Sequence, residues 1–313
     1  MTQDKQATRV AALVGATGSG KTALAIALRQ RHGLPIEAIN LDALQVYRRL
    51  AAGTAKPDAA ERAALPYHLL DCAEPTEAMN AAHFAALADA AIAEVHSRGA
   101  WPLLVGGTGL YLRAVLRGMA EIPEVAPELR EQLAQEWQER GAHKLHTELA
   151  SVDPVYAASV PAANRQRVLR ALEVWRATGR PFSQWHQEHA AQPDRYQALI
   201  TVLEPPVDVL RARIETRARA MAAPLLAEVA ALLSGDAALA PDAPAMQALG
   251  YRDAVAVLRG DQPAEDFADR LAHAHWLYAR RQGTWFRALD AQLRLRGEAD
   301  DAQRFAAALT AVF

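Results

Sequence analysis

Short apolar runs alternate with longer amphipathic stretches along most of the chain. Four runs predict buried strands, at residues 10–14, 35–40, 101–105 and 198–203. Amphipathic segments predict helices at residues 23–28, 80–98, 110–118, 207–233, 244–258 and 264–296. Residues 67–71 are expected to add a short buried segment. Strands that alternate with helices favour an α/β fold, a parallel sheet flanked by helices.

One long region departs from this alternation. Between residues 122 and 192 the periodic segments are helical, at about 128–150 and 164–178, with no strand between them. We therefore expect an α/β core with C-terminal helices, formed by residues 1–121 and 193–313. The core would carry an all-helical insertion at residues 122–192.

The first predicted strand runs into a glycine-rich turn. The pattern Gly, four residues, Gly-Lys-Ser/Thr is matched by Gly15, Ala16, Thr17, Gly18, Ser19, Gly20, Lys21 and Thr22. Glycines let several backbone N–H groups face one anion, and the following helix adds positive potential. The segment therefore predicts a P-loop NTPase-like core that binds a diphosphate or triphosphate. Lys21 would hold terminal phosphate oxygens and the Thr22 hydroxyl a magnesium ion.

Further candidate residues follow the predicted strands. Ligands of open α/β sheets bind beyond the carboxyl ends of the strands, where Asp42 and Thr108 are expected. Asp42 suits a general base or a magnesium ligand. The third strand ends in glycines instead of the acid of an ordinary ATPase, which argues mildly against a hydrolytic motor. Arg213 and Arg217 lie four residues apart, so they share a helix face and suggest a second clamp on the phosphates.

Composition narrows the class of protein without naming a substrate. The 313 residues are 51% hydrophobic and 22% charged, typical of a globular protein. Without an apolar run long enough for a membrane span or a signal-peptide layout, we expect a cytoplasmic protein. One cysteine, Cys72, excludes an internal disulfide. The net charge is −2, yet residues 161–220 hold ten Arg and six Asp or Glu. On charge alone, RNA binding and a solvated helix face are equally favoured.

An ordered set of segments resembles the bacterial tRNA dimethylallyltransferases, also called tRNA isopentenyl-diphosphate transferases, over nearly the whole chain. The segments are the phosphate loop, Asp42 to Arg48, Gly53 to Pro57, His68 to Asp71, Pro102 to Tyr111, Asn164 to Val174, Arg213 to Arg217 and Gln247 to Arg252. The phosphate loop alone is unspecific, whereas the ordered set is highly specific.

The resemblance implies a reaction and a role for each segment. A dimethylallyl group would pass from dimethylallyl diphosphate to the exocyclic nitrogen of the adenosine 3′ of a tRNA anticodon, with Mg²⁺ as cofactor. Asp42 would accept the proton of the adenine amine, Thr108 would orient the amine or the base, and Arg217 would hold the diphosphate. The adenine would have to leave the stacked anticodon loop to reach the pocket.

The resemblance also implies contacts to the tRNA anticodon stem-loop. They fall on Asp42, Ala43, Leu44, Gln45, Thr108, Arg130, Gln166, Arg167, Val168, Leu169, Arg170, Gln247, Gly250, Tyr251 and Arg252. These implied contacts favour RNA binding over a solvated helix face as the role of the arginines in residues 161–220. A monomer is expected.

The chain departs from the family pattern at Ala16 and Gly18, where proline and alanine are common, which keeps small residues and should be harmless. Further differences, the last of them from the eukaryotic members only, stand out. Ala43 and Leu44 replace a serine and an arginine, Gly109 replaces a larger apolar residue, and no cysteine–histidine zinc finger follows the core. Three alternatives to tRNA modification remain open: prenylation of free adenine nucleotides, an ATP-binding small-molecule kinase, and an RNA-binding module without catalysis.

Overall fold

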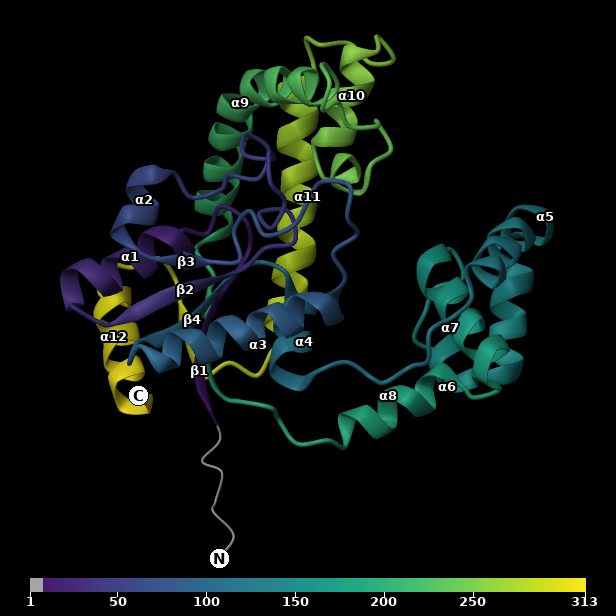
Figure 1. The fold of residues 1–313 in the computed structure, drawn as a ribbon, viewed down its shortest axis with the longest axis horizontal. Coiled ribbons are helices and arrows are strands. Elements are labelled where there is room, and N and C mark those ends of the chain that lie inside the picture. The colour runs from purple at the N-terminus through teal and green to yellow at the C-terminus, as the bar shows by residue number, and fades with distance from the viewer. Residues whose placement is uncertain (1–7) are drawn as a thin grey trace, which may run out of the picture. The chain divides into compact units, whose positions relative to one another are not determined.

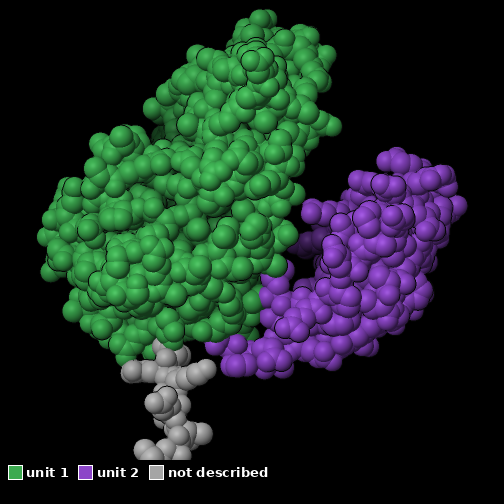
Figure 2. All heavy atoms as spheres, viewed as in Figure 1, with its two compact units in different colours: residues 1–118, 195–313 green, residues 119–194 purple. Residues whose placement is uncertain are grey.

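A computed structural model describes residues 8–313, which form two compact units (Figures 1 and 2). One unit consists of the residues up to 118 and residues 195–313, and the other consists of residues 119–194. The expected boundaries, at 121/122 and 192/193, fall within a few residues of these positions.

The larger unit is built on a six-stranded parallel sheet, as the alternation of strands and helices predicts. The strand order is β3-β2-β4-β1-β5-β6. The strands are β1 (Arg9–Val14), β2 (Ile36–Leu41), β3 (Tyr67–His68), β4 (Trp101–Gly106), β5 (Gln197–Leu203) and β6 (Leu293–Leu295). All neighbouring pairs are parallel. The carboxyl ends of β1, β2 and β4 therefore share one edge, at Val14, Leu41 and Gly106.

The larger unit has eight α-helices among its described residues, some of which cover the two faces of the sheet. They are α1 (Lys21–His32), α2 (Ala59–Ala64), α3 (Ala81–Ser97), α4 (Gly109–Arg117), α9 (Val207–Leu232), α10 (Tyr251–Leu258), α11 (Phe267–Arg287) and α12 (Asp301–Val312). Ala11 and Leu13 of β1 share a core with residues of α1 and α12. Val10, Ala12 and Val14 point to the other face and are also buried, because successive side chains of a strand alternate.

Three sequence-based expectations for this unit are wrong. The helix expected over 244–258 is divided into a 3₁₀ helix at Pro244–Gln247 and α10, because Gly250, with φ 85°, turns the chain between them. The helix expected over 264–296 ends at Arg287, and Leu293–Leu295 form strand β6 beside β5. Three residues are too few to show a period, and pairing with β5 decides their conformation. Residues 67–71 are half-buried, not buried, because β3 is the edge strand of the sheet.

The smaller unit contains helices and no strand across its described residues. Its helices are α5 (Pro127–Val152), α6 (Pro154–Ala157), α7 (Arg165–Thr178) and α8 (Phe182–Ala190). Helix α5 is broken at Gly141, whose φ of 80° is outside the helical range. The unit has its own apolar core, in which Leu133 and Leu149 of α5 pack with Leu172 of α7. No helix in the described part of the chain is long and apolar enough to cross a bilayer.

Candidate active site

The phosphate loop joins β1 to α1 at the carboxyl edge of the sheet. Gly18 and Gly20 have φ values of 80° and 103°, which side chains other than glycine rarely adopt. The Lys21 Nζ donates to the carbonyl oxygens of Gly15 and Ala16, at 2.9 Å each. Burial lowers the pKa of Lys21 to about 8, although the negative charge of Asp42 opposes this shift. The loop thus places a desolvated cation beside its own backbone, as binding of phosphate requires.

Helix α9 brings two further cations to the phosphate loop. The Arg213 Nη1 donates to the Ser19 carbonyl oxygen at 3.2 Å, and the Arg217 Nη2 donates to the Thr17 hydroxyl oxygen. The Arg217 Nε is buried without a hydrogen-bond partner among residues 8–313. Burial lowers the pKa of Arg217. The expected pairing of these two arginines on one helix face therefore holds, and both face the loop.

The loop that follows β2 presents Asp42. Its Oδ1 accepts hydrogen bonds from the backbone N–H groups of Leu44, at 2.9 Å, and Gln45, at 3.4 Å. The Thr108 Oγ1, at the start of α4, accepts from the Ala43 N–H at 3.1 Å. Asp42 and Thr108 are therefore joined through one short loop.

A cavity of about 320 Å³ connects these groups. Lys21, Asp42, Gln45, Arg213 and Arg217 all line it, together with residues of the glycine turn after β4. One cavity thus contains cations able to hold a diphosphate and a carboxylate able to accept a proton.

Helix α11 supplies residues that sequence reasoning did not place in the site. The buried Gln282 bonds to the phosphate loop and to the Gly107 carbonyl oxygen, and it lines the cavity. Burial and the nearby charge of Asp42 raise the pKa of Tyr278 to about 12. Burial and the charge of Arg217 lower the pKa of His275 to about 4. The helical spacing of 275, 278 and 282 is the signal that points to a shared face.

Hydrogen bonds hold the Gly53 to Pro57 segment against helices α9 and α10. The Gln45 side chain donates to the carbonyl oxygens of Thr54 and Ala55, at 3.1 and 3.2 Å. The Tyr251 hydroxyl accepts from the Gly53 N–H at 3.2 Å and donates to Glu228 at 2.6 Å. A Cβ on Gly53 would lie 2.4 Å from the Tyr251 ring, so only glycine fits there.

The expectation that the Tyr251 side chain contacts tRNA is therefore corrected. Its side chain is fully buried and supports the loop, and Gly250, with φ 85°, turns the chain into α10. Their neighbours Gln247 and Arg252 are exposed, as contacts to a macromolecule require. Ala43, Leu44 and Gln45 are partly exposed beside the cavity.

The expected tRNA-contacting residues of the helical unit divide into three groups. Gln166 and Arg167 are exposed. Val168 and Leu169 are buried in the core of the unit, so their side chains cannot contact a partner, and the expectation for them is corrected accordingly. Arg170 bonds to Glu173 at 3.1 Å, and Arg130 lies 3.8 Å from the same carboxylate.

The donor set of the cavity suits a magnesium ion. Mg²⁺ prefers oxygen ligands, and the hydroxyl of Thr22 and the carboxylates of Asp42 and Glu61 all line the cavity. The Tyr67 hydroxyl lines it as well and is buried without a hydrogen-bond partner in the described chain. Asp71 is held instead by Lys56 and Arg62, at 2.6 and 3.1 Å. The cavity therefore offers oxygen donors of the kind that Mg²⁺ prefers, whereas the Asp71 carboxylate is bound to two cations.

The departure at Gly109 is explained by a neighbour on α11. A Cβ at this position would lie 2.4 Å from the Trp285 indole ring. The indole thus takes the space that a larger side chain at 109 would need.

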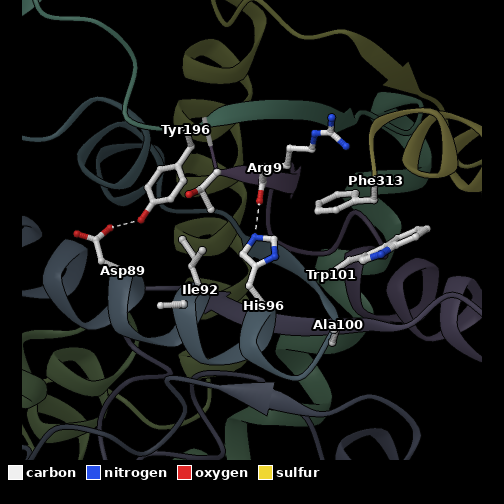
Figure 3. A pocket seen from close by; sticks show the side chains of 11 residues that line it. Arg9, Asp89, Ile92, His96, Ala100, Trp101, Tyr196 and Phe313 are labelled. Carbon is white, nitrogen blue, oxygen red and sulfur yellow. Dashed lines mark hydrogen bonds between the residues drawn. The ribbon is translucent and has the colours of Figure 1, made fainter. Parts of the chain in front are cut away.

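A larger hollow, of about 570 Å³, lies at the opposite edge of the sheet (Figure 3). There the Tyr196 hydroxyl donates to Asp89 at 2.7 Å, and the His96 ring bonds to the Arg9 carbonyl oxygen at 2.8 Å. Trp101 stacks on Phe313. This hollow contains none of the phosphate-loop residues and lies at the amino ends of the strands, away from the edge where α/β sheets bind ligands.

Comparisons with known proteins agree with this geometry. Residues 45–289 match the family model of IPP transferase, and residues 8–77 match that of isopentenyl transferase. A tRNA dimethylallyltransferase of Anaeromyxobacter dehalogenans is 50% identical over 279 residues, covering 89% of this chain and 92% of that protein. One of Stenotrophomonas maltophilia is 46% identical, covering 90% of each.

Solved structures are similar over nearly the whole chain. The tRNA isopentenylpyrophosphate transferase of Bacillus halodurans superposes with a TM-score of 0.70 at 32% identity, covering 98% of this chain and 96% of that one. A eukaryotic dimethylallyltransferase that acts on tRNA has the same fold, with a TM-score of 0.77 at 24% identity, covering 97% of this chain and 78% of that one. The chain belongs to the IPP transferase family, the tRNA dimethylallyltransferases.

Proposed function

We propose that this protein transfers a dimethylallyl group from dimethylallyl diphosphate to the exocyclic N6 of the adenosine 3′-adjacent to the anticodon of tRNA. The products are N6-(dimethylallyl)adenosine and diphosphate. The observation that carries the proposal is that Lys21, Arg217 and Asp42 line a single cavity. Family membership supports the same reaction, since the relatives described above are named for it.

The departing diphosphate is assigned to the phosphate loop. As the bond between the allylic carbon and the diphosphate oxygen breaks, negative charge grows on the leaving group. Lys21, Arg213 and Arg217 line the cavity and are positioned to stabilise that charge. Mg²⁺, held by the Thr22 hydroxyl, would neutralise further charge on the leaving diphosphate.

Asp42 is assigned to the adenine. The N6 lone pair forms the new bond to the allylic carbon, and the nitrogen must then lose a proton. Asp42 accepts it, because its Oδ1 is fixed by two backbone N–H groups while Oδ2 has no hydrogen-bond partner among residues 8–313. Thr108 orients the Asp42 loop through its bond to the Ala43 N–H.

The tRNA is assigned to exposed polar residues on both units. Gln166 and Arg167 on the helical unit and Gln247 and Arg252 near α10 are exposed, and Gln45 lines the cavity itself. Arg and amide side chains are suited to phosphates and to base edges of single-stranded RNA. We further propose that the protein acts as a monomer and that it lies in the cytoplasm with its tRNA substrate.

The test is incubation of the protein with dimethylallyl diphosphate, Mg²⁺ and unmodified tRNA, followed by mass analysis of the nucleosides. We expect a dimethylallyl mass increment on one adenosine, and none when the diphosphate is omitted. A parallel arm offers AMP as acceptor, and a second compares equilibrium binding of ATP with that of dimethylallyl diphosphate. Transfer to AMP alone, or binding of ATP with no transfer, would contradict the proposal.

A further inference from the structure

We propose that Gln282 is a positioning residue that fixes the distance between the two halves of the active site. The inference rests on the proposed function and adds a residue to it. Gln282 lies on α11 and is only 6% exposed. Its Oε1 accepts a hydrogen bond from the Thr17 N–H at 2.8 Å, and its Nε2 donates to the Gly107 carbonyl oxygen at 2.9 Å.

The two partners of Gln282 belong to opposite sides of the reaction. Thr17 is part of the phosphate loop, and its hydroxyl oxygen accepts from Arg217, on the side of the leaving group. Gly107 precedes Thr108, whose Oγ1 bonds to the backbone beside Asp42, on the side of the acceptor. One amide group therefore connects the loop that holds diphosphate to the turn that supports the base.

The connection is rigid because both partners are backbone groups. An amide side chain is suited to it, since it carries one donor end and one acceptor end at a fixed separation. A Cβ on Gly107 would lie 2.3 Å from the Gln282 Nε2, so glycine is what allows the approach. Removing the amide would leave a part-buried N–H and a buried C=O unpaired, which the chain would relieve by shifting one of the two loops.

A shift of this kind would slow transfer more than it would weaken binding. Displacement requires the attacking nitrogen, the allylic carbon and the leaving oxygen to be aligned, and alignment is sensitive to small displacements. When the two hydrogen bonds of Gln282 are removed, the phosphate loop keeps its contacts to diphosphate and the Asp42 side of the cavity keeps its contacts to adenine. The rate of transfer and the affinity for diphosphate should therefore respond differently.

The first test is Gln282→Leu, assayed for the single-turnover rate of transfer to tRNA and for the Kd of inorganic pyrophosphate. We expect transfer about 100-fold slower with the Kd changed less than about threefold. The control is Gln292→Leu, because the exposed Gln292 also accepts a backbone hydrogen bond at its Oε1, from the Ile200 N–H at 2.7 Å, outside the cavity. Its rate should equal that of the wild type.

The second test is Gln282→Glu, which is readable even if the leucine variant fails to fold. When protonated, the introduced carboxyl accepts from the Thr17 N–H and donates to the Gly107 oxygen, as the amide does. When ionised it only accepts, and it faces a carbonyl oxygen. Burial and the facing carbonyl oxygen disfavour the ionised form, so the pKa of the introduced carboxyl should lie above its ordinary value of about 4.3, and the ratio of its transfer rate to that of the wild type should fall as the pH rises through that raised pKa.

Three results would overturn the inference. They are a leucine variant as fast as the wild type, a loss of pyrophosphate affinity in step with the loss of rate, and a glutamate variant whose rate ratio is independent of pH. Absence of transfer in the wild type would instead contradict the proposed function and leave the amide bonds unaffected.

Discussion

The arginines of the two units are held in different ways. In the helical unit, Arg176 donates to Glu136 and Glu148, at 2.6 Å each, and Arg140 joins the same two carboxylates. In the α/β unit, Arg213 and Arg217 bond to a carbonyl and a hydroxyl oxygen of the phosphate loop, without an ion pair in the described chain. The first arrangement stabilises a fold, and the second leaves positive charge available to a ligand.

The difference follows from the free energy of desolvation. A cation that burial desolvates is costly unless a negative group lies beside it. The lowered pKa of Arg217 and the pKa of about 8 for Lys21 report that cost. A bound diphosphate would offset it, because its charge takes the place that glutamates occupy around Arg176. A count of charges does not distinguish these arginines. Their bonding partners do, because these are glutamates in the helical unit and uncharged oxygens in the phosphate loop.

The largest expected difference is between two alanine variants, one at an arginine of each unit. Arg217→Ala should slow transfer about 100-fold while the midpoint of thermal unfolding stays close to that of the wild type. Arg176→Ala should lower the free energy of unfolding by about 2 kcal/mol and leave the rate of transfer nearly unchanged. Single-turnover assays and thermal melts of both variants check this. Equal effects of the two variants on transfer would remove the distinction.

The pH dependence of diphosphate binding sharpens the account of Lys21. Because its pKa is about 8, Lys21 loses its proton as the pH rises above 8, and affinity for pyrophosphate should fall. If binding requires this one proton, the Kd for pyrophosphate should rise by at most about tenfold for each pH unit above the pKa. Lys21→Arg is the control, since arginine stays charged and the ionisation of pyrophosphate affects both proteins alike. Titration calorimetry at several pH values should show the ratio of the two Kd values changing with pH, and a constant ratio would contradict the assignment.

A smaller effect is expected at an unpaired arginine of the helical unit. Arg167 is exposed, and within residues 8–313 its guanidinium has neither a hydrogen bond nor an ion pair. Arg167→Ala should weaken tRNA binding a few-fold and reduce the slope of log affinity against log salt by about 1. Filter binding over a range of salt concentrations measures both. Arg140→Ala is the matched control, because Arg140 is occupied by glutamates; an equal loss of slope there would contradict the distinction.

The smallest expected effect concerns the acid stability of the helical unit. Hydrogen bonds from Arg176 and Arg140 hold the pKa of Glu136 at about 2, below its ordinary value of 4.5. A lowered carboxyl pKa contributes stability that is present above 4.5 and is lost as the pH falls towards 2. Glu136→Gln should therefore reduce stability by about 1 kcal/mol at neutral pH and flatten the acid limb. Chemical denaturation at several pH values measures this, and parallel acid limbs would contradict it.

Sequence patterns predicted the sheet and the phosphate loop because both depend on local signals. Glycines, a lysine and an apolar strand lie within about a dozen consecutive residues, and such a segment has few alternative structures. Strand β6 escaped prediction because its three residues acquire their conformation from β5, far away in the sequence.

The site was predicted less completely than the fold. Asp42, Thr108 and Arg217 were placed at the correct edge because strand ends and helix spacing locate them. Gln282 was missed because its two partners lie 265 and 175 residues away. A motif match also does not distinguish buried from exposed residues, so Val168 and Tyr251 resembled contact residues although packing holds them inside.

The central claim is that one cavity holds the departing diphosphate while Asp42 takes the proton from adenine. Asp42→Asn tests it most directly, because an amide oxygen still accepts from the Leu44 N–H but the side chain is no longer a base. The account predicts single-turnover transfer about 1000-fold slower, with the affinities for pyrophosphate and tRNA retained. Transfer at the wild-type rate in this variant would contradict it.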